Sequence, residues 1–341
     1  MRVLLAPDKF AGTLSSVEVC DSIRAGWHDV AANDLVTAAP MADGGPGFLA
    51  ALATAAGVTP RVVETVGPHG EYLSTQLLLL LDAGRPTAFI EAASCCGLAL
   101  APEPRRPLAA SSGGLAPLIE AAVGMGATRV VIGVGGTAST DGGRPVFEAL
   151  VGTIPAEVDL VVATDVDNPL LGPAGAARSF GPQKGATDAE VSALERRLSA
   201  WAAGADVDPS APGAGAGGGL AYGLMRLGAR RVSGAAVVAD AIDLDGQMSG
   251  ADLIVTGEGG LDFSSLRGKV VAYVAGRAQA MARPCIAIAG GVQVGRREAA
   301  AAGLDEIYSL VDVVGRDRAI GQPAAAVRQV AALAARDWSR R

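Results

Sequence analysis

The sequence predicts an α/β protein in which a Rossmann-like or flavodoxin-like doubly wound parallel sheet carries an inserted second α/β domain with antiparallel strands. Near both ends of the chain, short apolar runs alternate with helical patterns, which is typical of a parallel sheet covered by helices. In the middle, closely spaced apolar runs are separated by turn residues, which indicates antiparallel pairing. A chain of 341 residues is also longer than one ordinary core, so we expect two domains.

The outer segments supply the strands of the parallel sheet. Buried strands are expected at residues 2–6, 35–39, 252–256, 285–289 and 306–311. The first run leads through a capping box, Ser15-x-x-Glu18, into a helix. The same run is too short for a signal peptide, because Asp8 and Lys9 follow it at once, and it is expected to be the first strand.

The middle of the chain follows a different pattern. Pro68-His69-Gly70 and Asp82-Ala83-Gly84 separate apolar runs, as turns separate the strands of hairpins. We therefore expect a discontinuous Rossmann-like domain, residues 1–60 plus 250–341, and an inserted domain, residues 61–249.

Composition and charge exclude several classes of protein. The formal net charge of −7 and the lack of a basic run disfavour a nucleic-acid partner. The leucine run 77–81 is too short to cross a bilayer, so no membrane association is expected. The cysteines lack metal-ligand spacing and are expected to be reduced core residues of a cytoplasmic protein. They are Cys20, Cys95, Cys96 and Cys285.

Polar and glycine residues follow the outer strands. In an open parallel sheet, ligands bind at the carboxyl ends of the strands. The residues expected at that edge are Asp8, Lys9, Asp43, Gly44, Gly45, Glu258, Gly290 and Gly291. Their clustering predicts a binding site there.

A second acidic group follows the apolar run 158–163. Asp165 and Asp167 are two residues apart, so on a continuing strand they would face the same side. Asn168-Pro169 then predicts a turn, and Lys184 follows on a loop framed by glycine and proline. Paired carboxylates near a lysine suit metal-assisted phosphoryl transfer. A solvated acidic turn is the alternative.

Lysine usage adds to this hypothesis. Lys9, Lys184 and Lys269 are the chain's lysines, and the rest of its 28 basic residues are arginine. Each lysine lies among glycine or turn residues, where a compact ammonium group can meet phosphate. Chance placement is the alternative for any single one.

A glycine loop, residues 135–143, follows the apolar run 129–134. Gly133-x-Gly135-x-x-Ala138 matches a loose dinucleotide fingerprint, so a nicotinamide enzyme is an alternative. Because Asp141-Gly142-Gly143 precedes the expected helix start at Pro145, a nest of N–H groups for ATP phosphates is favoured. The chain has no P-loop motif and no Gly-x-Ser-x-Gly, and only two histidines, His28 and His69.

Together, these motifs resemble the type I glycerate kinase family of bacteria along nearly the whole chain. The matching segments are APDKF at 6–10, PMADGG at 40–45, GVGGTASTDGG at 133–143, DVDNPLLG at 165–172, FGPQKGAT at 180–187, PGAGAGGGL at 212–220 and TGEG at 256–259. The resemblance implies phosphorylation of D-glycerate with ATP and Mg²⁺, at the 2-hydroxyl in most bacterial members. It also implies an active site in the cleft between the two domains.

Each group of motif residues is expected to have a role in this reaction. Asp165 and Asp167 are expected to be the general base or Mg²⁺ ligands, with Lys184 contacting phosphate. The expected nucleotide-phosphate residues are Gly135, Gly136, Thr137, Ala138, Ser139 and Asp141. The expected substrate residues are Asp8, Lys9, Asp43, Gly44, Gly45, Asn168 and Glu258.

Among the departures from the family pattern, three lie beside the motifs of the expected active site. Family members commonly have Lys, Glu and Arg where this chain has Ala11, Pro46 and Gly260. The acceptor therefore stays open between D-glycerate and another small hydroxy acid or polyol, and a weakly active regulatory homologue is a further alternative. The expected partners are the small acceptor and ATP. The oligomeric state is left open, with a homodimer as one alternative.

Overall fold

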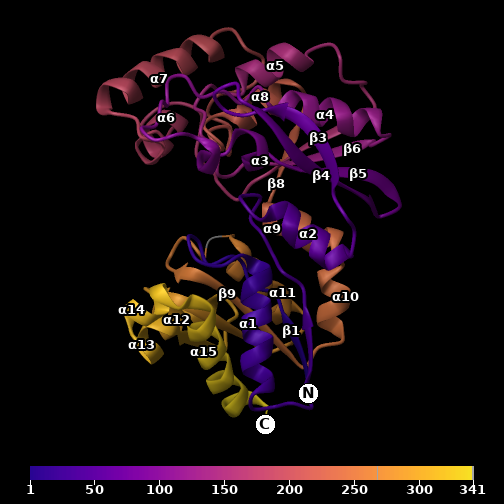
Figure 1. The fold of residues 1–341 in the computed structure, drawn as a ribbon, viewed down its shortest axis with the longest axis vertical. Coiled ribbons are helices and arrows are strands. Elements are labelled where there is room, and N and C mark those ends of the chain that lie inside the picture. Colours follow the sequence, from indigo (N-terminus) through magenta and orange to yellow (C-terminus); the bar gives the residue numbers. More distant parts are fainter. Residues whose placement is uncertain (267, 340–341) are drawn as a thin grey trace. The chain divides into compact units, whose positions relative to one another are not determined.

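The computed structural model describes residues 1–266 and 268–339, which form two compact units (Figure 1). Unit 1 comprises Met1–Ala42, Ala50–Gly57 and Ala235–Arg341, and unit 2 comprises Asp43–Leu49 and Val58–Gly234. Residues 267, 340 and 341, which fall within the expected Rossmann-like domain, lie outside the described residues.

Unit 1 is built on a five-stranded parallel sheet. Its order is β11-β10-β9-β1-β2. The strands are β1 (Arg2–Leu5), β2 (Leu35–Ala38), β9 (Leu253–Leu261), β10 (Cys285–Val292) and β11 (Glu306–Ser309). The chain proceeds from β1 to β2 on one side and from β9 to β11 on the other. The topological switch point, where a doubly wound sheet binds ligands, therefore lies between β1 and β9.

Helices cover this sheet and bury its apolar side chains. Helix α1 (Ser16–His28) begins with the expected capping box, in which Ser15 and Glu18 bond each other's backbone N–H. Ile23 and Trp27 of α1 belong to the same buried cluster as Leu5 and Ile288 of the sheet. The other helices of unit 1 are α10 (Leu244–Ser249), α11 (Val270–Ala280), α12 (Arg296–Ala301), α13 (Leu310–Val314), α14 (Arg316–Gly321) and α15 (Pro323–Trp338). Helices α2 (Phe48–Ala56) and α9 (Gly234–Ala241) begin in unit 2 and continue in unit 1.

Unit 2 contains a six-stranded sheet in sequential order from β3 to β8. The strands are β3 (Arg61–Val66), β4 (Tyr72–Asp82), β5 (Arg85–Glu91), β6 (Arg129–Gly133), β7 (Asp159–Ala163) and β8 (Arg230–Val232). Strands β3, β4 and β5 pair antiparallel, and β5 to β8 pair parallel. The predicted fold class, a parallel sheet with a second sheet that has antiparallel pairs, is confirmed.

The core of unit 2 lies between this sheet and its helices. Ile90, Val130 and Val162 of the strands are buried in one cluster with Leu118 and Leu220 of two helices. The helical segments are α3 (Ala93–Cys96), η1 (Leu98–Leu100), α4 (Leu115–Gly124), α5 (Arg144–Leu150), α6 (Ala176–Phe180), η2 (Pro182–Lys184), α7 (Asp188–Ala202) and α8 (Leu220–Arg226). Across residues 1–266 and 268–339, no helix combines the length and apolar character needed to cross a bilayer.

Candidate functional site

The parallel strands of unit 2 end at one edge of the sheet, and loops from each strand gather there. Strand β6 leads into the glycine loop, β7 into the loop with Asp165 and Asp167, and β8 into Ser233 and Gly234. The strands are parallel, so their carboxyl ends lie at the same edge, where such sheets place ligands.

Residues Asp43 to Gly45 belong to this edge, although they precede the strands of unit 2 in the chain. The Gly44 carbonyl accepts a 3.0 Å hydrogen bond from the Gly135 N–H. Gly44 has a φ of +85°, and a Cβ at this position would clash with the Ala163 carbonyl at the end of β7. Only glycine meets both conditions without strain. This close approach places Asp43 beside the loop that follows β7.

Asp43 and Asp165 both lie next to Gly234. The Gly234 N–H donates to Asp165 Oδ1 at 2.9 Å. A Cβ on Gly234 would clash with the Asp43 carbonyl. Asp43 Oδ1 accepts from the Gly45 N–H at 3.0 Å, and both carboxylates are half-buried. The structure therefore groups the predicted residues Asp43, Gly44 and Gly45 with Asp165.

Asp167 has a different environment from Asp165. Strand β7 ends at Ala163, so the two acids lie in the following loop and not on a continuing strand. Asp167 forms a 2.7 Å ion pair with Arg231, and its side chain is 77% exposed. Asn168 Nδ2 donates to the Ala174 carbonyl, which fixes the next turn of this loop.

Lys184 is buried against the glycine loop, with 4% of the residue exposed. Its Nζ donates to the Ser139 carbonyl and to Thr137 Oγ1, the latter at 3.3 Å. Thr137 Oγ1 in turn donates to the Gly217 carbonyl at 2.8 Å. Burial lowers the pKa of Lys184 to about 8, and Asp141 partly opposes this shift. The lysine therefore holds the loop in shape from within the protein.

Asp141 anchors the far end of the glycine loop. Its carboxylate accepts hydrogen bonds from the Ser112 N–H at 2.7 Å, the Ser112 hydroxyl at 3.1 Å and the Gly143 N–H at 3.0 Å. Burial raises the pKa of Asp141, and these bonds act in the opposite direction. In this arrangement Asp141 ties the loop to the segment that leads into α4.

Part of the loop's backbone is already engaged inside the protein. The Gly135 N–H donates to the Gly44 carbonyl, and the Ala138 N–H donates to the Cys96 carbonyl at 2.8 Å. Neither N–H can meet a phosphate without breaking its bond. The N–H groups of Gly136, Thr137 and Ser139 remain within residues 135–139, and of these residues Gly136 is exposed whereas Thr137 and Ser139 are buried.

The other predicted site residues lie in unit 1, at the ends of β1 and β9. The Asp8 N–H donates to the Gly257 carbonyl at 2.8 Å. Asp8 Oδ1 accepts from the Lys9 N–H at 2.7 Å and lies 3.7 Å from Lys9 Nζ. Glu258 lies within β9, which continues past the predicted strand end to Leu261. These residues flank the switch point of the unit 1 sheet.

Two residues outside the predicted site support the edge of unit 2. Glu91 is the last residue of β5, and its Oε2 accepts from the N–H groups of Gly47 and Leu49 at 3.0 and 3.2 Å. It thereby fastens the segment that carries Asp43. Its place at the end of an apolar run was a usable signal. Arg231, the partner of Asp167, lies in a three-residue strand whose sequence has no apolar run.

Comparison with known proteins identifies the family. The model of the glycerate kinase family matches residues 3–154 and 151–339. The glycerate 2-kinase of Escherichia coli K12 is 35% identical over 351 residues, which cover 92% of each chain. The glycerate kinase of Bacillus subtilis 168 is 35% identical over 349 residues, 91% of this chain and 90% of its own.

A solved structure agrees with these relatives. A protein from Salmonella typhimurium LT2, assigned as glycerate kinase 2, superposes with a TM-score of 0.80 at 31% identity. The match covers 100% of this chain and 98% of the other. The resemblance drawn from the motifs is thus confirmed. The chain belongs to the glycerate kinase family and is an enzyme of the kinase class.

Proposed function

We propose that the protein transfers a phosphoryl group from ATP to the 2-hydroxyl of D-glycerate and releases 2-phosphoglycerate. The observation that carries this proposal is the pair Asp43 and Asp165, held on either side of Gly234 at the sheet edge that also bears the glycine loop. Phosphoryl transfer needs a carboxylate near the acceptor hydroxyl, oxygen ligands for a divalent cation and a positioned phosphate loop. This edge supplies all three kinds of group.

Asp165 is the proposed general base or Mg²⁺ ligand. Among the described residues no cluster of three or more His, Cys, Asp or Glu side chains has the geometry of a metal site. Mg²⁺ often takes only one or two protein carboxylates, with phosphates and water completing its shell. Asp165 and Asp43 fit that requirement as hard oxygen donors. When bound, Mg²⁺ would neutralise charge on the phosphates.

Asp167 is a weaker candidate than Asp165. Its ion pair with Arg231 already satisfies part of its carboxylate, and most of the side chain is exposed. A carboxylate in bulk water is also less able to act on a reacting hydroxyl, because solvent screens its charge. We therefore assign the chemical role to Asp165 and propose that Asp167 orients the loop.

Lys184 and the glycine loop would position the phosphates. The buried ammonium group holds the Ser139 carbonyl, so the loop keeps one conformation before the nucleotide arrives. Its positive charge adds to the attraction for phosphate. The N–H group of Gly136, the exposed residue of this stretch, is the proposed direct contact. For the acceptor we propose contacts from Gly44, Gly45 and Asn168 of unit 2. For Asp8, Lys9 and Glu258 of unit 1 we propose a part in substrate binding.

A coupled assay with ATP and D-glycerate, with the product identified by NMR, tests the proposal. Asp165→Asn should lower kcat by roughly 100-fold or more, because a positioned proton acceptor contributes about that much. Asp206→Asn is the matched control, since Asp206 lies on a separate loop. Full activity in Asp165→Asn and in Asp43→Asn would refute the assignment. A strong preference for another hydroxy acid would instead correct the acceptor.

A further inference from the structure

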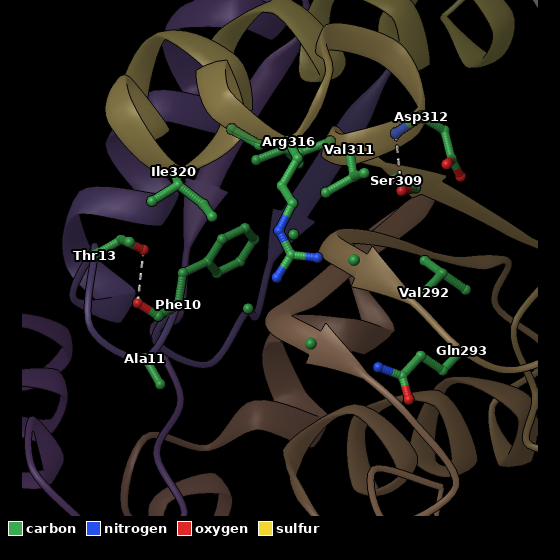
Figure 2. Close-up of a pocket in the computed structure, with 16 residues that line it drawn as sticks. Phe10, Ala11, Thr13, Val292, Gln293, Ser309, Val311, Asp312, Arg316 and Ile320 are labelled. Carbon is green, nitrogen blue, oxygen red and sulfur yellow. Dashed lines mark hydrogen bonds between the residues drawn. The ribbon is translucent and has the colours of Figure 1, made fainter.

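Unit 1 has a cavity of about 420 Å³ at the carboxyl ends of its strands (Figure 2). Phe10 and Ala11, which follow β1, form one part of its wall, and the ends of β9, β10 and β11 together with helices α13 and α14 form the rest. The cavity therefore includes the switch point between β1 and β9. Its size falls in the range of small-molecule sites, and its place in the fold is where doubly wound sheets bind ligands.

The floor of this cavity consists of backbone. Gly260 of β9 and Gly291 of β10 are register partners in the parallel ladder. A Cβ added to either glycine would have no heavy atom of the described residues within 4 Å, so both face open space. Without side chains here, a ligand can approach the peptide groups of both strands directly.

Arg316, the first residue of α14, supplies the positive charge of this cavity. It is the only cationic residue among the described residues that line the cavity, and its guanidinium extends toward Phe10 and the ends of β9 and β10 (Figure 2). Within residues 1–266 and 268–339, Arg316 makes no ion pair at 4.0 Å or less. The nearby Asp312 carboxylate points away from it in the same view. The guanidinium fork is therefore available to a planar pair of oxygens.

The wall beside Arg316 is apolar. Val311, Ala319 and Ile320 line it together with Phe10, and Ile320 is 58% exposed. A site that combines one cation, a backbone floor and an apolar wall suits a small ligand with one anionic end and a short carbon body. Inorganic phosphate, which has no carbon body, would contact the arginine but would gain nothing from the apolar wall.

We propose that this cavity binds the oxyanion of a small ligand, a carboxylate or a phosphate, on Arg316. The two sources of such a group in the proposed reaction are the carboxylate of the acceptor and the phosphates of the nucleotide. The inference rests on the proposed function only for this choice of ligands. D-Glycerate and ADP, titrated separately, distinguish the two sources.

The test uses isothermal titration calorimetry on the full chain and on two arginine variants. Arg316→Gln should weaken the binding of one of the two ligands by roughly 10- to 100-fold, the loss expected for hydrogen bonds to a charged group. Arg318→Gln is the matched control, because Arg318 lies on the same helix and does not line the cavity. The inference would be overturned if Arg316→Gln bound both ligands as tightly as Arg318→Gln does. It would also be overturned if the wild type bound neither ligand at millimolar concentration.

A second variant tests the cavity without changing charge. Gly291→Leu places a side chain in the open space and should weaken the same ligand, with a thermal melt confirming that the variant is folded. Unchanged affinity of the folded variant for that ligand would also count against binding in the cavity.

Steady-state kinetics separate this inference from the proposed function. If the wild type phosphorylates D-glycerate and Arg316→Gln keeps both KM values, the inference alone fails. If the wild type is inactive on D-glycerate but binds either ligand through Arg316, the proposed function alone fails.

Discussion

Replacing Lys184 with methionine tests whether this lysine holds the glycine loop at the cost of a buried charge. Methionine has a similar length and flexibility but no charge and no donor. Lys184→Met therefore removes the burial penalty of the ammonium group. It also leaves the Ser139 carbonyl and the Thr137 hydroxyl without the Nζ donor.

The magnitudes nearly cancel at neutral pH. Burial lowers the pKa of Lys184 from 10.5 to about 8, and at about 1.36 kcal/mol per unit this corresponds to a cost of about 3 kcal/mol. Leaving a buried carbonyl without its partner costs about 1–3 kcal/mol. We therefore expect Lys184→Met to change the free energy of unfolding by less than about 2 kcal/mol at pH 7.5.

The difference between the two proteins should depend on pH with a definite sign. Between the folded pKa of about 8 and the unfolded pKa of 10.5, the unfolded wild type binds more protons than the folded one. Wild-type stability therefore rises with pH in this window. Relative to Lys184→Met, the wild type should gain about 2 kcal/mol between pH 7.5 and pH 9.5.

Urea unfolding of both proteins at these two pH values measures this gain. Titrating groups that do not interact with Lys184 are common to both proteins and cancel in the difference. A wild-type-minus-variant difference that stays constant with pH would refute the account of a charged, buried Lys184. If Lys184→Met keeps near-normal stability but loses kcat, the lysine contributes more to catalysis through the glycine loop than to the stability of the fold.

Two further predictions follow from the edge of unit 2. Gly44→Ala should destabilise the protein by more than about 2 kcal/mol, because a left-handed backbone and a clash with β7 add together. Gly47 has a φ of +94° but faces open space, so Gly47→Ala should lower the stability by only about 1 kcal/mol. Thermal melts of both variants measure the two losses. Equal losses would contradict the explanation of the Gly44 effect by packing against β7. Arg231→Ala should change stability by less than about 1 kcal/mol, because Asp167 is largely solvent-exposed. A larger loss in urea unfolding would show that this ion pair supports the fold.

Much of the fold follows from local patterns in the sequence. Strands β1, β9 and β10 are buried on both faces and therefore appear as continuous apolar runs. The capping box at Ser15 is a contact between residues three apart, so the sequence specifies it directly. Strand β8 was not predicted, because three residues paired at the edge of a sheet need no apolar run. The glycines that extend β9 to Leu261 are held by pairing with β10, which is a long-range contact.

The candidate site likewise depends partly on local sequence patterns and partly on long-range contacts. Local sequence patterns are enough to indicate which residue types carry the chemistry: the acids at strand ends, the glycine loop and the scarce lysines. How these residues face one another depends on long-range contacts of the folded chain. Asp43 joins Asp165 because Gly44 packs against β7. Asp165 and Asp167 diverge because β7 stops at Ala163, and Lys184 turns inward to the Ser139 carbonyl. Such contacts join residues far apart in the chain, and no local pattern of the sequence encodes their direction.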